Sequence, residues 1–335
     1  MKVVLGLLLA LLFGCAHTPV APVVDVASTV QMEVVEMGML PTNRPSTLNV
    51  WFLKGTCAAL NEKQLCLADA AITNKVVVLS HGAMGSARGL SWLGEKLAAA
   101  GHVVLGINHF EESSMYGKES QNPRATSVIW QRPQDISALL DKLVTKGIFQ
   151  KPVDYSNVIA IGHSSGGQTA AMLAGATFDL QQLTDYCASS EQSKGDVSCG
   201  YGGGAGSAPT SFKKHFSTSH ADARVKAIVL LDPALGSAVQ VTSLRKINIP
   251  TLVVGAENND FLPWKQHGLR YASEIPNAKI NSLKSQEGHF VFISACSHKT
   301  KVMGISLCED RGGVDRKAVQ ESVFDGLIAF VRAQG

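Results

Sequence analysis

A serine within a glycine-rich segment is the feature of this sequence best suited to covalent chemistry. The segment GHSSGG, residues 162–167, follows the apolar run 157–161 and precedes a helix-compatible stretch. In a strand-turn-helix context, G-x-S-x-G makes a sharp turn that projects the serine hydroxyl and needs glycine around it. The sequence therefore predicts Ser164 as a nucleophile, with the backbone N–H of Ser165 as an oxyanion donor.

A second glycine-containing segment, SHGAMG at residues 80–85, follows the apolar run 75–80. Small residues there allow the backbone to approach a reacting carbonyl group. We expect the N–H of Ala83 to be the second oxyanion donor, and His81 to brace the loop.

A serine of ordinary pKa needs an imidazole to accept its proton, and the imidazole needs a carboxylate to orient it. His289 lies in a Gly-His-Phe segment after the strand-like run 278–283. Two carboxylates compete for the third role. Asp232 directly follows the apolar run 225–231, and Asp260 lies in the loop after the apolar run at 250–255.

Short runs rich in Val and Ile alternate with helix-compatible stretches along most of the chain. Apolar runs of this kind indicate strands buried on both faces, and the alternation indicates a doubly wound, mainly parallel α/β sheet. We expect an irregular, lid-like insertion at 177–224, which contains two cysteines and a glycine-rich patch. The expected strands are 30–37, 48–53, 75–80, 102–108, 157–161, 225–231, 250–255 and 278–283; the expected helices are 89–100, 133–146, 166–176, 263–274 and 316–332.

Together these segments resemble the α/β-hydrolase superfamily. Within it, they resemble the group of platelet-activating-factor acetylhydrolases, chlorophyllases and the proteins called predicted dienelactone hydrolases. The resemblance covers about residues 48–332, through S-H-G at 80–82, G-x-N-H at 106–109, G-H-S-x-G-G at 162–167, L-D-P-A-L-G at 231–236 and G-H-F at 288–290.

The resemblance implies the chain order serine, acid, histidine, which makes His289 the base. Acetylhydrolases and chlorophyllases carry the acid on the L-D or D-P segment, which favours Asp232. Most α/β hydrolases carry it in the later loop, so Asp260 is the alternative, although the spacing familiar from cutinase-like members places Asn259 there. The resemblance implies ester substrates and chemistry that needs no metal or cofactor. True dienelactone hydrolases use cysteine as nucleophile, so the serine here does not imply their reaction.

The first residues predict export and a lipid anchor. Lys2 precedes an apolar stretch of eleven residues, 3–13, too short to span a bilayer and typical of a secretory signal. The segment LFGC at 12–15 resembles the bacterial lipoprotein cleavage box, which implies lipid modification of Cys15. We therefore expect a signal peptide at 1–14, a tether at 15–30, and one α/β-hydrolase domain at 31–335.

The seven cysteines are consistent with an oxidising compartment. With Cys15 assigned to the lipid, six remain, and fifteen pairings are possible. They fall into three sequence-local couples, which predict three disulfides: Cys57–Cys66, Cys187–Cys199 and Cys296–Cys308. Zinc binding is disfavoured because we expect neither a C-x-x-C motif nor a short cluster of His and Cys. We expect the second and third disulfides to stiffen the rim of the active site.

Charge excludes one class of partner. The chain has 30 Lys and Arg against 27 Asp and Glu, with no long run of like charge, so nucleic-acid binding by phosphate neutralisation is not expected.

The sequence predicts a membrane-anchored serine ester hydrolase facing the periplasm or cell surface, acting on short-chain or lipid-like esters. The alternatives are a lipase or cutinase-like polyester hydrolase, and an inactive lipid-anchored binding protein.

Overall fold

The computed structural model of this 335-residue chain describes residues 29–57, 64–203 and 209–334. The predicted signal peptide, the lipid site Cys15 and nearly all of the predicted tether lie outside these residues. The sheet begins at Val30, the last residue assigned to the tether, because Val30 pairs with Leu53 and the neighbouring Lys54 N–H donates to the Thr29 carbonyl.

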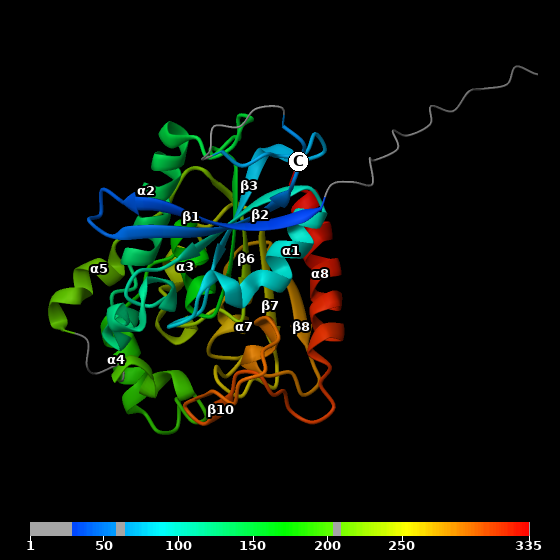
Figure 1. Ribbon diagram of the computed structural model, residues 1–335. Helices are drawn as coiled ribbons and strands as arrows, with labels where there is room; N and C mark the ends of the chain where they lie inside the picture. Colours follow the sequence, from blue (N-terminus) through cyan, green and yellow to red (C-terminus); the bar gives the residue numbers. More distant parts are fainter. Residues whose placement is uncertain (1–28, 58–63, 204–208, 335) are drawn as a thin grey trace, which may run out of the picture.

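Eight strands form one sheet in the order β1-β2-β4-β3-β5-β6-β7-β8 (Figure 1). β2 pairs antiparallel with β1 and β4, and all other neighbours are parallel. The α/β-hydrolase fold class expected from the sequence is thereby confirmed. The strands are β1 Val30–Met39, β2 Pro45–Leu53, β3 Ile72–Ser80, β4 His102–Asn108, β5 Val158–His163, β6 Val225–Leu231, β7 Thr251–Ala256 and β8 Lys279–Leu283, and a separate hairpin comprises β9 Lys301–Val302 and β10 Ile305–Ser306.

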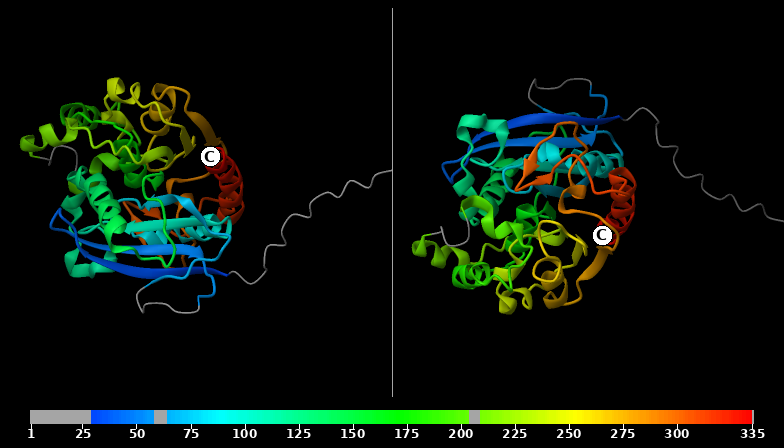
Figure 2. Two further views of the ribbon diagram at one scale, coloured as in Figure 1. Left: turned by 90° about the horizontal axis from the view of Figure 1, so that it is seen from above. Right: turned by 90° about the horizontal axis from the view of Figure 1, so that it is seen from below.

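The central strands carry apolar side chains on both faces because helices cover both faces. β4, β5 and β7 are buried along their whole length. Val78 of β3 belongs to one apolar core with helices α2 (Gln131–Lys146) and α3 (Ser165–Leu173). Its neighbours Val77 and Leu79 belong to a second core with helices α1 (Ser91–Ala99) and α8 (Arg316–Arg332). The two views of Figure 2 show α8, in red, at the opposite side of the molecule from the green insertion helices.

The observed helix bounds agree best with the predicted ones in the two longest helices, α2 and α8. The predicted helix 263–274 starts only at Gly268, because His267 has φ −118° and ψ −96°, outside the helical region. No described helix is both long and apolar enough to cross a membrane. The helices are α1 Ser91–Ala99, α2 Gln131–Lys146, α3 Ser165–Leu173, α4 Leu180–Ala188, α5 Lys213–Ser217, α6 Val241–Leu244, α7 Gly268–Glu274 and α8 Arg316–Arg332.

The described part of the insertion at 177–224 is more regular than the sequence indicated. It contains α4 and α5 because aromatic side chains anchor it to the body of the protein: Phe178 and Phe216 are almost fully buried. Phe178 also makes a β-bridge with Val239. These helices are short, nine residues in α4 and five in α5, so their apolar pattern covers too few turns to stand out in the sequence.

The three disulfides have the predicted pairing: Cys57–Cys66, Cys187–Cys199 and Cys296–Cys308. Each closes a short loop, with a sequence separation of 9, 12 and 12 residues respectively. Loops of this size are expected to contribute roughly 2 to 3 kcal/mol each through the entropy of the unfolded chain.

Candidate active site

Ser164 occupies a strained turn between β5 and α3. Its backbone has φ 57° and ψ −119°, a conformation that costs an L-residue about 1–3 kcal/mol. A Cβ atom on Gly162 would overlap the Gly166 carbonyl, and a Cβ atom on Gly166 would overlap the carbonyl of Ser80 at the end of β3. The two glycines of the motif are therefore required by backbone approach, as the sequence predicted.

Hydrogen bonds fix this turn to the neighbouring strand. The N–H of Ser164 donates to the Leu231 carbonyl at 2.9 Å, and the N–H of Ala234 donates to the Ser164 carbonyl at 3.1 Å. The two bonds join Ser164 to residues on either side of Asp232. The positions of Ser164 and Asp232 therefore depend on the same contact between the ends of β5 and β6.

The structure brings His289 and Asp232 together. His289 begins a 3-10 turn after β8, and its Nδ1 lies 3.4 Å from Asp232 Oδ2. The imidazole packs between two rings, with centroid distances of 4.5 Å to His163 and 5.1 Å to Phe261. Both His289 and Asp232 are buried, so the pair is shielded from water and its geometry is fixed by packing.

The carboxylate of Asp232 is held by two donors besides the imidazole. Oδ1 accepts a hydrogen bond from the Ala256 N–H at 3.0 Å, and Oδ2 accepts one from the Asn259 side-chain amide at 2.5 Å. The side-chain oxygen Oδ1 of Asn259 accepts in turn from the N–H groups of Phe261 and Leu262. Sequence reasoning treated Asn259 only as a misplaced acid, whereas the structure uses it to orient Asp232.

Asp260, the alternative acid, contacts the backbone of His289 and has no hydrogen bond to its ring. Its Oδ1 accepts a hydrogen bond from the His289 N–H at 2.9 Å, and its Oδ2 lies 4.0 Å from Arg311 Nε. The two carboxylates thus approach the same histidine from different sides, and only Asp232 faces the ring nitrogen.

Burial is the main cause of the pKa shifts of both His289 and Asp232. It lowers the pKa of His289 to about 3, although the charge of Asp260 opposes this shift. Burial also raises the pKa of Asp232 well above its ordinary value, and the hydrogen bonds from Ala256 and Asn259 oppose that rise. The imidazole is therefore neutral at pH 7, which is the form that can accept a proton from a hydroxyl group.

Ser164 and His289 line one cavity of about 490 Å³. Ala83 and Ser165, the expected oxyanion donors, line the same cavity. Its wall is largely apolar, and none of the described residues that line it is acidic. The apolar side chains come from the insertion (Leu180, Leu183, Phe216), from the loop before α2 (Ile129), and from the segment around and beyond His289 (Phe290, Val302, Leu307).

A buried ion pair supports the loop that carries Ala83, and sequence reasoning did not identify it. Arg132, in the first turn of α2, binds both carboxylate oxygens of Glu112 at 2.7 Å. The guanidinium also donates to the carbonyls of His81 and Gly82, and Glu112 Oε2 accepts from the Met84 N–H. The ion pair therefore fixes the backbone on both sides of Ala83.

Charge on Glu112 is maintained despite its burial. Burial works to raise the pKa of its carboxyl group, but Arg132, His81 and the hydrogen bond from the Met84 N–H together outweigh burial and lower that pKa below its usual value. The acidic residue and the arginine are separated by 19 intervening residues in the sequence, with no motif to connect them. Only the fold brings them together beneath the loop.

His81 braces the same loop, as expected. Its Nδ1 lies 2.7 Å from the Gly82 carbonyl, and its Nε2 accepts from the N–H of His109 at 3.1 Å. Burial lowers the pKa of His81 to about 4. Both ring nitrogens are thus occupied by the backbone, which gives His81 a structural part in the loop.

The second and third disulfides border the cavity, since Cys187 and Cys296 are among its lining residues. The insertion is also fixed to the loop after β7 through a buried contact, in which His267 Nε2 lies 2.7 Å from Asp196 Oδ2. Tyr186 donates a hydrogen bond to the same oxygen of Asp196 at 2.9 Å. The described part of the insertion therefore forms part of the cavity wall.

Comparison with protein-family models and with curated proteins finds no match. The solved structures with a similar fold include a ferulic acid esterase from Streptomyces cinnamoneus. The two chains are 18% identical, with a TM-score of 0.45, and the likeness covers 82% of this chain and 78% of the esterase. A likeness of this strength carries no information about the substrate of this chain.

Asn substitutions distinguish the two carboxylates. Asp232→Asn should reduce the turnover of p-nitrophenyl acetate by about 10⁴-fold, because an amide at this position holds the imidazole in the wrong tautomer and cannot stabilise its charge. Asp260→Asn should reduce turnover only modestly, because the amide oxygen can still accept the His289 N–H. Circular dichroism and thermal unfolding of both variants control for loss of the fold. A larger loss in Asp260→Asn, or no loss in either variant, would contradict the assignment.

Proposed function

We propose that this protein is a serine carboxylic ester hydrolase that works through an acyl-enzyme intermediate. The observation that carries the proposal is the convergence of Ser164, on a strained turn, and the buried His289–Asp232 pair at one apolar cavity. A buried neutral imidazole beside a carboxylate is the arrangement that activates a serine hydroxyl.

In the proposed mechanism, Ser164 Oγ attacks the carbonyl carbon of the ester while His289 accepts the hydroxyl proton. Asp232 stabilises the resulting imidazolium. The N–H of Ser165, in the first turn of α3, binds the oxyanion, and the N–H of Ala83 is the proposed second donor. The intermediate collapses as His289 protonates the departing alcohol. Water, deprotonated by His289, then attacks the acyl group and releases the carboxylic acid and Ser164.

The proposed substrates are short-chain or lipid-like esters. Asp232 directly follows β6, the position at which the sequence resembles acetylhydrolases and chlorophyllases. A cavity of about 490 Å³ must hold both the acyl and the alcohol groups. Its apolar wall also suits a lipase or polyester hydrolase, which is the second candidate activity. An inactive binding protein of the same fold is the remaining alternative.

We further propose that the protein is an exported bacterial lipoprotein, anchored through Cys15 and facing the periplasm or cell surface. The three disulfides support an oxidising compartment. An anchored hydrolase with an apolar cavity would meet lipid-like substrates at the membrane surface.

Labelling by a fluorophosphonate probe tests the nucleophile. The wild-type protein should be labelled, and Ser164→Ala should not, because the probe reacts only with an activated hydroxyl. Ser273→Ala, which changes an exposed serine on α7, serves as the matched control and should be labelled like wild type. Absence of labelling in the wild type would favour the binding protein, and equal labelling of Ser164→Ala would exclude Ser164 as the nucleophile.

A panel of p-nitrophenyl esters tests the substrate class. We expect kcat/KM to be highest for acetate or butyrate and to fall through octanoate to palmitate, because the cavity has to hold the alcohol group as well as the acyl chain. Ser164→Ala measures the background hydrolysis of each ester. A maximum at palmitate would favour the lipase alternative.

Metabolic labelling with a fatty-acid analogue tests the anchor. The wild-type chain expressed in a bacterium should incorporate the label and sediment with membranes, whereas Cys15→Ser should do neither. The three predicted disulfide pairs are untouched by this substitution. Membrane association of Cys15→Ser, or an unlabelled wild type, would contradict the lipoprotein proposal.

A further inference from the structure

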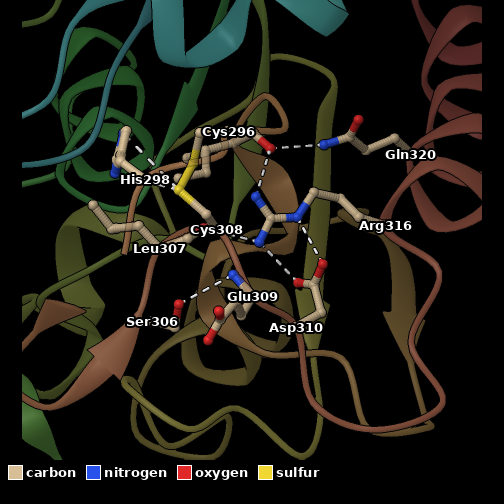
Figure 3. The surroundings of a disulfide bond; sticks show 10 residues. Cys296, His298, Ser306, Leu307, Cys308, Glu309, Asp310, Arg316 and Gln320 are labelled. Atoms are coloured by element: carbon tan, nitrogen blue, oxygen red, sulfur yellow. Dashed lines mark hydrogen bonds and ion pairs between the residues drawn. A yellow bond between two sulfur atoms is a disulfide. The ribbon is translucent and has the colours of Figure 1, made fainter. Parts of the chain in front are cut away.

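A histidine lies against the third disulfide, on the rim of the cavity (Figure 3). His298 Nδ1 is 3.4 Å and Nε2 is 3.9 Å from Cys308 Sγ. The ligand atoms of Cys296, His298 and Cys308 all lie within 4.8 Å of one another. Among residues 29–57, 64–203 and 209–334, these three side chains form the one group that combines three potential metal ligands so closely.

The spacing is close to what a tetrahedral ion requires. Zn–S and Zn–N bonds of about 2.3 and 2.0 Å place sulfur and nitrogen ligands about 3.5 Å apart, and two sulfurs about 3.8 Å apart. The Nδ1 atom of His298 already lies at such a distance from Cys308 Sγ, and all three ligand atoms lie within 4.8 Å of one another. The two sulfur atoms, which are bonded to each other in the disulfide, would have to separate.

Two chain segments, here called arms, carry the cysteines: residues 293–300 precede the β9–β10 hairpin and residues 307–310 follow it. Hydrogen bonds hold the two arms together independently of the disulfide. β9 and β10 pair as a hairpin between them, and the Leu307 N–H extends this pairing by donating to the Thr300 carbonyl at 3.0 Å. Thr300 is two residues from His298, and Leu307 directly precedes Cys308. The hairpin therefore keeps the histidine close to Cys308 when the disulfide is open.

Two side chains of helix α8, Arg316 and Gln320, hydrogen-bond to the same two arms (Figure 3). Arg316 donates to the Leu307 carbonyl at 2.9 Å and to the Ile293 carbonyl at 3.4 Å, and Asp310 pairs with its guanidinium. Gln320 donates to the Ile293 carbonyl at 2.9 Å. With both arms anchored, ordering the ligands costs little additional conformational entropy.

We propose that Cys296, His298 and Cys308 form a redox-controlled binding site for a thiophilic cation, Zn²⁺ or Cu⁺. A thiol or dithiol reductant transfers two electrons to the disulfide, which becomes two thiols while the reductant becomes a disulfide. The cation then displaces the two thiol protons and binds two thiolates and the His298 imidazole. Solvent supplies a fourth ligand to Zn²⁺, whereas Cu⁺ is satisfied by the three protein ligands. A disulfide oxidant that accepts two electrons, and is itself reduced to thiols, restores the Cys296–Cys308 disulfide and releases the cation.

The site is accessible, and it adjoins the proposed catalytic cavity. His298 is exposed, and Cys296 and His298 line the cavity that contains Ser164. Reduction and metal binding therefore replace the Cys296–Cys308 disulfide at the cavity rim by metal–ligand bonds to the same two sulfur atoms. The metal site itself does not depend on the proposed hydrolase activity, because its three ligands take no part in that reaction.

Co²⁺ titration of the full chain under anaerobic conditions tests the proposal. After reduction and removal of the reductant, the wild-type protein should bind one Co²⁺ per chain with the absorption of thiolate-to-cobalt charge transfer, and Zn²⁺ should displace it. The oxidised protein should show no such absorption. His298→Ala, which leaves both cysteines in place, should weaken Zn²⁺ binding by at least about tenfold.

Three controls make the result specific. Lys299→Ala, in the same loop, should bind metal like wild type. Cys57→Ser/Cys66→Ser, which removes another disulfide, should also retain the site. Cys296→Ser/Cys308→Ser should lose it, with circular dichroism reporting whether this variant folds. Equal Co²⁺ absorption in wild type and Cys296→Ser/Cys308→Ser, or unchanged affinity in His298→Ala, would overturn the proposal.

Discussion

The close approach of three backbone segments beside Ser164 is the constraint on which the rest of the site depends. Gly162 and Gly166 touch across the turn, and Gly166 touches the end of β3. The strain at Ser164 is tolerated because the backbone bonds to β6 over-determine the turn. A single arrangement of β3, β5 and β6 therefore positions the serine, the oxyanion loop after β3 and the carboxylate after β6.

Neutral hydrogen-bond donors hold the buried carboxyl group of Asp232 in place. Asp232 is buried beside a neutral imidazole, and an amide and a backbone N–H hold its two oxygens. The second buried carboxylate, Glu112, is paired with Arg132 and supports the loop around Ala83. Each carboxylate is thus fixed before a substrate arrives, which is the preorganisation that electrostatic catalysis requires.

Much of this organisation could be predicted from the sequence, because buried parallel strands and a G-x-S-x-G turn leave strong local signals. The expected strand 225–231, which is β6, and the three disulfide pairs follow from residue type and spacing alone. The choice between Asp232 and Asp260 could not be made firmly, since both lie near the same histidine and differ in which of its atoms they face. The roles of Asn259, Arg132 and Glu112 depend on tertiary contacts that no local pattern records.

The central claim is that Ser164 carries the acyl group. Mass spectrometry of the protein quenched during turnover of p-nitrophenyl acetate tests it most directly. The account predicts a mass increase of one acetyl group, located by fragmentation on Ser164, that decays as the product acid is released. An unmodified protein during turnover, or an acetyl group located on Ser165 or another residue, would contradict the account.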